Sequence, residues 1–168
     1  FQIEKYRILQ PILEHLAKKL GYSVKFSARD GVEQVNVLCA KAPWDVALTT
    51  AVGSREQLVK GGSVGIILLA SLSERELRQI LKNEEETEAL IARIDDFRKE
   101  GFCFNPATLD QTARYHVDAL SVPVTNAENV ITGVLTILST PGVLVQAEKQ
   151  ELINEMQKAA EFCADVMY

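Results

Sequence analysis

The chain has 168 residues, of which 47% are hydrophobic and 24% are charged, and its formal net charge at pH 7 is −5. This length and composition fit a single domain with a packed, soluble core and exclude a disordered chain. The acidic balance and the lack of a dense lysine–arginine run argue against direct binding of nucleic acid, which needs a patch of charge that neutralises phosphates.

The first predicted element is an amphipathic helix over residues 2–20. Its apolar stripe repeats at spacings of four and three residues and consists of Leu9, Leu13, Leu16 and Leu20. Pro11 is awkward within a helix, so it marks either a kink or the first turn of a helix that begins near Leu9. A glycine at position 21 ends the segment.

A pair of strands is predicted next. Residues 22–29 and 32–41 have strand character, and the Asp-Gly dipeptide at 30–31 between them is a strong hairpin signal. Pro43 breaks the second strand. Strand character then resumes over residues 44–52.

The middle of the chain begins with a polar connection over residues 53–60. A glycine-rich stretch at 61–65 leads into the apolar run 66–70, which predicts a short buried helix whose backbone closely approaches another group. Residues 73–76 (Ser-Glu-Arg-Glu) form a capping box, which opens a further helix that ends near Leu81.

The last part of the chain predicts a helix, an irregular segment, a hairpin and a final helix. The first of these helices ends at Gly101, which can adopt the left-handed closing conformation. Apolar strands at 119–125 and 130–139 flank a four-residue turn at 126–129. Residues 144–167 form a long helix with a wide apolar face, so the layout is α+β.

Three further features concern the context of the chain. The longest apolar run, residues 64–72, is far shorter than the roughly 20 residues that span a bilayer. The chain begins with Phe1 rather than methionine, so we expect it to be a fragment of a longer polypeptide. Cys39, Cys103 and Cys163 are odd in number and widely spaced, which indicates reduced thiols in the cytoplasm.

Four segments carry a resemblance to a known protein family. They are residues 8–26 (ILQPILEHLAKKLGYSVKF), 58–81 (LVKGGSVGIILLASLSERELRQIL), 92–104 (ARIDDFRKEGFCF) and 119–142 (ALSVPVTNAENVITGVLTILSTPG). In this order they resemble the carboxyl-terminal effector-binding domain of the IclR family of bacterial transcription regulators. The shared features are a small-residue motif before an apolar helix, an arginine–spacer–glycine–aromatic helix end, and a closing hairpin. The resemblance covers essentially the whole chain.

The resemblance implies a GAF-like fold over residues 1–168. In this fold the N- and C-terminal helices pack on one face of a central antiparallel sheet, and further helices pack on the other. It also implies an effector that is a small organic acid, and a homodimer or homotetramer. In such regulators a helix-turn-helix domain that precedes the effector domain binds operator DNA. An effector that favours one assembly state would then move the DNA-binding domains.

The family's ligand pocket corresponds to three parts of this sequence. Carried over position by position, the predicted contact residues are Ser63, Val64, Gly65, Asn105, Ala119, Thr136 and Leu138. Backbone amides of Val64 and Gly65, near a helix start, suit a carboxylate. The side chains of Asn105 and Thr136 could orient that carboxylate by hydrogen bonds.

Some positions depart from the family pattern. Some members carry an acidic residue near Asn105 and a cysteine near Ala119, and the family often has lysine where Ile66 stands here. These differences leave the predicted pocket less charged. They favour an effector with a larger apolar part, such as an aromatic acid, over a two-carbon acid.

Two alternatives to a ligand sensor remain open. One is a free-standing GAF-like enzyme with Cys103 as a redox nucleophile, although no second cysteine lies close to it in sequence. The other is a dimerisation domain with an empty pocket. Cys103, His116 and Asp118 are a weak candidate for a zinc site, because zinc usually needs three or four convergent ligands. We therefore predict no catalytic residue, no metal site and no cofactor.

Overall fold

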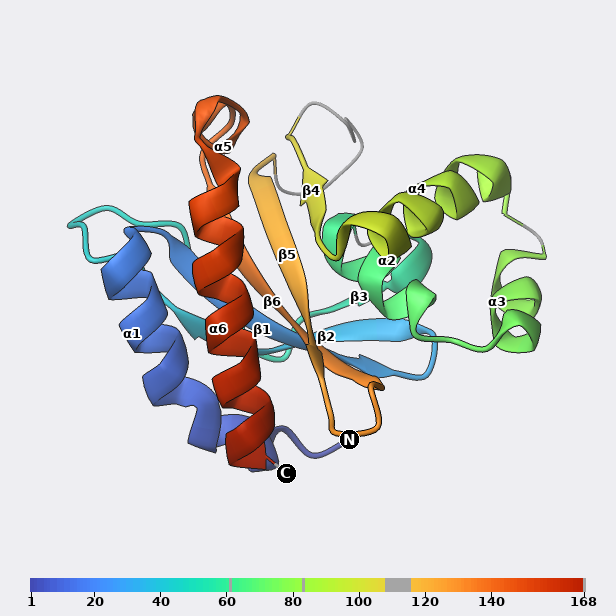
Figure 1. Ribbon diagram of the computed structural model, residues 1–168, viewed down its shortest axis with the longest axis horizontal. Helices are drawn as coiled ribbons and strands as arrows, with labels where there is room; N and C mark the ends of the chain where they lie inside the picture. The colour runs from blue at the N-terminus through green and yellow to red at the C-terminus, as the bar shows by residue number, and fades with distance from the viewer. Residues whose placement is uncertain (61, 83, 108–115, 168) are drawn as a thin grey trace.

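The computed structural model describes residues 1–60, 62–82, 84–107 and 116–167. Within these ranges the strands form one antiparallel sheet in the order β3-β2-β1-β6-β5-β4. The strands are β1 (Ser23–Asp30), β2 (Glu33–Ala40), β3 (Arg55–Gln57), β4 (Cys103–Asn105), β5 (Asp118–Thr125) and β6 (Ile131–Ser139). Helices cover both faces of this sheet (Figure 1), which confirms the predicted α+β class.

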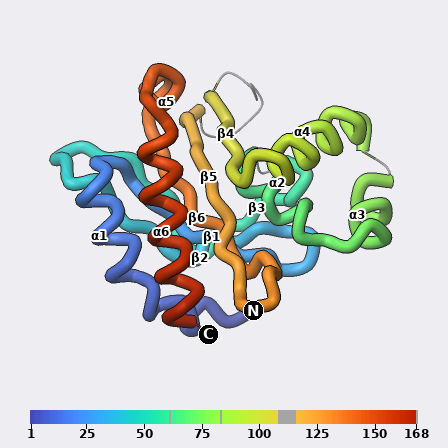
Figure 2. Tube along the Cα trace, viewed as in Figure 1, coloured from blue at the N-terminus to red at the C-terminus, as the bar shows by residue number. Residues whose placement is uncertain are grey.

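The helices from the two ends of the chain lie side by side on one face of the sheet (Figures 1 and 2). They are α1 (Gln10–Leu20), which follows the 3₁₀ helix η1 (Ile3–Leu9), and α6 (Lys149–Met167). Alternate strand residues such as Phe26 and Leu135 pack with the apolar sides of these helices in one buried cluster. The predicted packing of both terminal helices on one face is therefore confirmed.

The second face of the sheet carries α2 (Gly62–Ala70), α3 (Glu74–Leu81) and α4 (Thr87–Glu100) (Figure 1). α2 is buried on all sides from Ser63 to Leu69, because it lies between the sheet and α4. A separate apolar cluster joins α2, α3 and α4 to Val134 of β6. The sheet is thus covered on both faces, and side chains that point away from the α1–α6 face are also enclosed.

Several local predictions are confirmed. Pro11 lies in the first turn of α1, where its missing amide N–H removes no helical hydrogen bond. The capping box of α3 is complete, because the Ser73 hydroxyl accepts from the Glu76 amide at 3.2 Å and the Glu76 carboxylate accepts from the Ser73 amide at 3.3 Å. Gly101 ends α4 with a φ of 81°.

The close backbone approach expected from the glycine-rich stretch occurs at Gly65. A Cβ atom at this position would lie 2.0 Å from the carbonyl oxygen of Leu58, in the short 3₁₀ helix η2 (Leu58–Lys60). Only glycine lets α2 pack this tightly against the preceding chain. Gly61, which belongs to the same predicted stretch, lies outside the described residues.

Other predictions of local structure are wrong. The expected strand over residues 44–52 begins with bends and has no strand pairing, and its carbonyl groups accept hydrogen bonds from side chains, such as Ser23 to Leu48. The expected polar connection at 53–60 instead contains β3 and η2. The final helix is divided, because the short helix α5 (Val143–Gln146) precedes α6. No helix in the described ranges has the length and apolar character needed to cross a membrane.

Candidate functional site

A cavity of about 360 Å³ lies on the face of the sheet that α2 covers. Its inner wall consists of side chains from β1, β2, β5 and β6, and the first turn of α2 forms a second wall. Residues 48–51 and 54–56, together with Lys60, surround the opening. Because residues 51–56 are exposed, the cavity communicates with solvent on this side.

Most of the residues predicted from the family resemblance meet at this cavity. Those that line it are Ser63, Val64, Asn105, Ala119 and Leu138. The register of the sheet explains why they come together, because Ala119 on β5 lies between Asn105 on β4 and Leu138 on β6. The first turn of α2 then brings Ser63 and Val64 to the same space.

The two other predicted residues, Gly65 and Thr136, are not among those that line the cavity. Gly65 faces the backbone at Leu58, as described above. Thr136 is fully buried, and its hydroxyl lies 2.7 Å from that of Ser121.

A row of hydroxyl groups connects α2 to the sheet beneath the cavity. The Ser63 and Ser121 hydroxyl oxygens are 2.8 Å apart, and Ser121 continues the row to Thr136. All three residues are buried, so each hydroxyl depends on its neighbour for a hydrogen-bond partner. The row fixes the first turn of α2 above the centre of the sheet.

Lys25 is the cationic residue of the inner wall. It lies on β1, opposite Thr136 of β6 and Cys39 of β2. Burial lowers the pKa of the Lys25 ammonium, and the nearby charge of Glu56 opposes part of this shift. A cation that burial disfavours in this way is stabilised by an anion beside it.

Two polar residues of β2, Gln34 and Asn36, also line the cavity. Each is only 6% exposed. The Asn36 amide donates to the Thr50 hydroxyl and to the carbonyl of Ala51, which ties the segment at the opening to β2. Within the described part of the chain, Gln34 Nε2 and Asn36 Oδ1 are buried atoms that have no hydrogen-bond partner.

Asn105 is oriented by a neighbour on α4. The Arg93 guanidinium donates to Asn105 Oδ1 at 3.1 Å, so the amide nitrogen of Asn105 points the other way. That nitrogen lies 3.0 Å from the position that a Cβ on Gly62 would occupy. Asn105 therefore presents a hydrogen-bond donor towards the start of α2, where Gly62, Ser63 and Val64 line the cavity.

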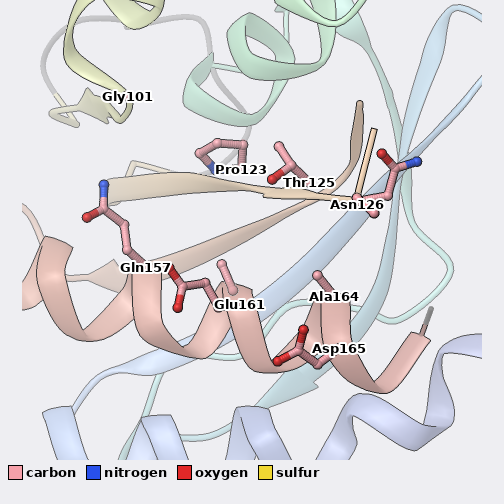
Figure 3. Close-up of a pocket in the computed structure, with 10 residues that line it drawn as sticks. Gly101, Pro123, Thr125, Asn126, Gln157, Glu161, Ala164 and Asp165 are labelled. Carbon is pink, nitrogen blue, oxygen red and sulfur yellow. The ribbon is translucent and has the colours of Figure 1, made fainter. Parts of the chain in front are cut away.

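A larger but more open hollow, of about 550 Å³, lies between the end of β5 and α6 (Figure 3). Its lining includes Pro123 and Thr125 on one side and Gln157, Glu161 and Asp165 on the other. The two carboxylates are exposed and would repel an anion. The cavity beside α2 is therefore the better candidate for an acidic ligand, because it offers a cation and buried donors.

Comparison with known proteins places the chain in a family. Residues 3–164 match the model of the bacterial transcriptional regulator IclR carboxyl-terminal domain. The chain belongs to the IclR family. It is 23% identical over 164 residues to the HTH-type transcriptional regulator KipR of Bacillus subtilis, and this match covers 92% of the chain. The chain spans 64% of the length of that relative.

Solved structures share the fold of this IclR domain at low sequence identity. One is an IclR homolog from Microbacterium hydrocarbonoxydans complexed with 4-hydroxybenzoate, with a TM-score of 0.79, 15% identity, and coverage of 99% of this chain and 70% of that one. Another is a double mutant of the inducer-binding domain of the PobR transcription factor from Acinetobacter, in complex with 3-hydroxybenzoic acid. It has a TM-score of 0.71 and 19% identity, over 95% of this chain and 94% of that one.

Asp118 and His116, two of the candidate zinc ligands, have different environments in this IclR domain. Asp118 is fully buried, and its carboxylate accepts from the backbone amides of Ala107, Gly142, Leu144 and Val145. His116 is exposed. In the part of the chain that the structure covers, no group of three or more histidine, cysteine, aspartate or glutamate side chains could hold a metal ion.

The contribution of β1 and β2 to the cavity was not predicted from the sequence. Lys25, Gln34 and Asn36 alternate with apolar residues of the core, a pattern that ordinarily places polar side chains in solvent. Here α2 and the segment 48–56 cover that side of the strands. The predicted fold already implied this, because polar side chains at the centre of a sheet with helices on both faces cannot all point into solvent.

Proposed function

We propose that this chain is the effector-sensing domain of an IclR-type transcription regulator and that the cavity beside α2 binds a small organic acid. Aromatic acids are the favoured class. The observation that carries this proposal is the cavity itself, which is lined by both the partly buried cation of Lys25 and the first turn of α2. The family membership supplies the regulatory context.

The acid group has suitable partners at the start of α2. The first amide N–H groups of a helix lack partners within the helix, and the helix dipole adds positive potential there. The first turn of α2, with Gly62, Ser63 and Val64, lines the cavity. The ammonium of Lys25 supplies a full positive charge in the same space, so a carboxylate would be held by both.

The remainder of the cavity suits an apolar body. Val64, Leu48, Ala119 and Leu138 contribute apolar side chains to its lining. Two structural relatives hold hydroxybenzoates, which combine a carboxylate with a flat apolar ring. Both relatives are less than 20% identical to this chain, so they support the class of ligand and leave its identity to experiment.

The regulatory part of the proposal concerns the whole protein. We infer that a helix-turn-helix domain outside this chain binds operator DNA, because KipR is an HTH-type transcriptional regulator, and that the protein acts in the cytoplasm. We also infer that the domain forms a homodimer or homotetramer. An effector with different affinities for two assembly states would shift the balance between them and so change DNA binding.

An enzymatic role has less support. The thiol of Cys103 is buried, and burial raises its pKa, although Arg93 opposes the shift. A redox nucleophile needs the thiolate form, which a raised pKa disfavours. We therefore propose that the domain binds its ligand without converting it.

Thermal unfolding with a panel of organic acids tests this proposal. An acid present at 100 times its dissociation constant should stabilise the domain by about 2.7 kcal/mol, which corresponds to a rise in Tm of roughly 5–11 °C for a chain of this size. The Lys25→Met variant should lose most of this rise. The exposed Lys18→Met variant, measured as a control, should retain it. If no aliphatic or aromatic acid raises the Tm of the native sequence, the proposal is wrong.

A further inference from the structure

The unpartnered atoms of Gln34 and Asn36 indicate a second recognition point within the proposed effector site. Each of these residues is only 6% exposed, and both line the cavity. Buried amide groups in folded proteins nearly always have hydrogen-bond partners. Among the described residues, Gln34 Nε2 and Asn36 Oδ1 have none. A bound molecule with a polar group at this point would supply the partner.

The two atoms differ in what they need. Gln34 Nε2 is a donor that lacks an acceptor, and Asn36 Oδ1 is an acceptor that lacks a donor. The orientation of the Asn36 amide is fixed by its contacts, because its nitrogen lies 3.1 Å from the carbonyl oxygen of Ala51, which can only accept. Turning the amide over would bring two acceptors together. The unpartnered atom of Asn36 is therefore its oxygen.

Gln34 and Asn36 are two residues apart on β2, so their side chains project from the same face of the strand as neighbours. A hydroxyl group both accepts and donates, so one hydroxyl could partner Gln34 Nε2 with its oxygen and Asn36 Oδ1 with its proton. An ionised carboxylate can only accept, so it would leave Asn36 Oδ1 unpartnered and repel it.

The sheet order separates this point from the start of α2. β1 and β6 lie between β2 and β5, and the hydroxyl of Ser63 is bonded to Ser121 on β5. Lys25 lies on β1, between the two. A ligand with a single polar end could therefore reach α2 or β2, whereas one with polar groups at both ends could reach both.

We propose that the effector is a hydroxy acid whose carboxylate faces Lys25 and the start of α2 and whose hydroxyl group bridges Gln34 and Asn36. This inference rests on the proposed function, because it names the chemical class of the ligand at the same site. In this proposal Gln34 and Asn36 on β2 make the site prefer acids that carry a hydroxyl group over acids that lack one.

Calorimetric titration of 4-hydroxybenzoate, 3-hydroxybenzoate, benzoate and 4-methoxybenzoate tests the assignment. The methoxy compound keeps the acceptor oxygen and lacks the proton. We expect at least one hydroxybenzoate to bind about tenfold more tightly than benzoate, a difference of about 1.4 kcal/mol. The methoxy compound should bind no better than benzoate, and this comparison needs no variant protein.

Variants then test whether Gln34 is responsible for the preference for hydroxybenzoates over benzoate. Gln34→Met keeps a side chain of similar length but removes the donor, so it should reduce the hydroxybenzoate preference while benzoate affinity changes little. Gln79→Met on the exposed side of α3 is the control and should leave the preference unchanged. If benzoate and hydroxybenzoates bind equally, or if Gln34→Met retains the full preference, the hydroxyl assignment is wrong and the proposed acid site stands. If no acid binds, both are wrong.

Discussion

The hydroxyl oxygens of Ser63 and Ser121 lie 2.8 Å apart and join the first turn of α2 to β5. Through Thr136, which is 2.7 Å from Ser121, the row extends to β6. The same turn of α2 lines the proposed acid site. A shift of α2 towards a bound carboxylate would therefore disturb this buried row of hydrogen bonds. The position of α2 thus depends on the polar contacts of its first turn.

The first prediction concerns this row. Ser121→Ala should leave Ser63 and Thr136 buried without a shared partner, and it should lower the free energy of unfolding by roughly 1–3 kcal/mol. Urea denaturation measures the loss. The triple variant with Ser63→Ala, Ser121→Ala and Thr136→Val removes all the polar groups together. It should cost less than the sum of the single changes, and strict additivity would contradict the role of the row.

The second prediction concerns the contact between Gly65 and Leu58. Gly65→Ala should destabilise the domain by about 1–3 kcal/mol or more, because the new Cβ would lie 2.0 Å from the Leu58 carbonyl oxygen and the backbone must move. Helix propensity alone predicts the opposite sign, a gain of about 1 kcal/mol. Ala89→Gly on the exposed side of α4 serves as a propensity control and should cost about 1 kcal/mol. A stabilised Gly65→Ala variant would show that the contact is not close.

The third prediction concerns the charge of Lys25. Because burial lowers the pKa of Lys25, the folded protein releases this proton at a lower pH than the unfolded chain. Between the two pKa values only the unfolded chain holds the proton, so the free energy of unfolding rises with pH there. Below both values the buried charge reduces stability without further change.

Lys25→Met removes that charge. The variant should be more stable than the native sequence at neutral pH in the absence of ligand, and its advantage should shrink as the pH approaches the ordinary lysine value of about 10.4. Denaturation at a series of pH values measures the difference, with Lys18→Met as the exposed control. An advantage that stays constant up to pH 10 would be attributed to packing and not to the charge.

Sequence patterns determined much of this fold, and the failures have physical causes. Alternation, the capping box at Ser73 and the glycine stop at Gly101 predicted local structure because each depends on a few neighbouring residues. The prediction of a strand at 44–52 was wrong because this segment is held by long-range hydrogen bonds from side chains, such as Asn36 to the Ala51 carbonyl, and not by pairing with a strand. Strand β3 was not predicted, because this short edge strand is exposed and its sequence has no alternation of apolar and polar residues.

The candidate site was predictable only in part, for a similar reason. The residues around α2 could be carried over from the family because they belong to recognisable motifs. Lys25 and Gln34 belong to no such motif, and their role depends on which elements cover the sheet. Thr136 was also predicted to contact the ligand. Its hydroxyl lies 2.7 Å from that of Ser121, its partner across β5 and β6, and only the sheet register brings these two residues together.

The fourth prediction concerns Asp118, the first residue of β5, whose carboxylate accepts hydrogen bonds from four backbone amides. Asp118→Asn should cost about 3 kcal/mol, because it removes a charged acceptor and turns an amide N–H₂ towards backbone donors. Chemical denaturation checks the value. The exposed Asp95→Asn change in α4 should cost less than about 0.5 kcal/mol. Equal effects of the two changes would contradict the structural role of Asp118.

The fifth prediction separates a ligand sensor from a cysteine enzyme. Burial raises the pKa of Cys103 and raises that of Cys163 to about 12. In a Cys39→Ser variant, which retains only these two thiols, labelling with a disulfide reagent at pH 8 should be slow in the folded state and fast in guanidinium. Rapid labelling of Cys103 in the folded protein would restore the case for a redox nucleophile.

The most direct test of the account is a crystal structure of the domain soaked with the organic acid that gives the largest rise in Tm. We expect the carboxylate to lie within hydrogen-bond distance of the first amides of α2 and of the Lys25 ammonium. An acid bound instead in the hollow between β5 and α6, or a cavity beside α2 that closes around its own side chains, would contradict it.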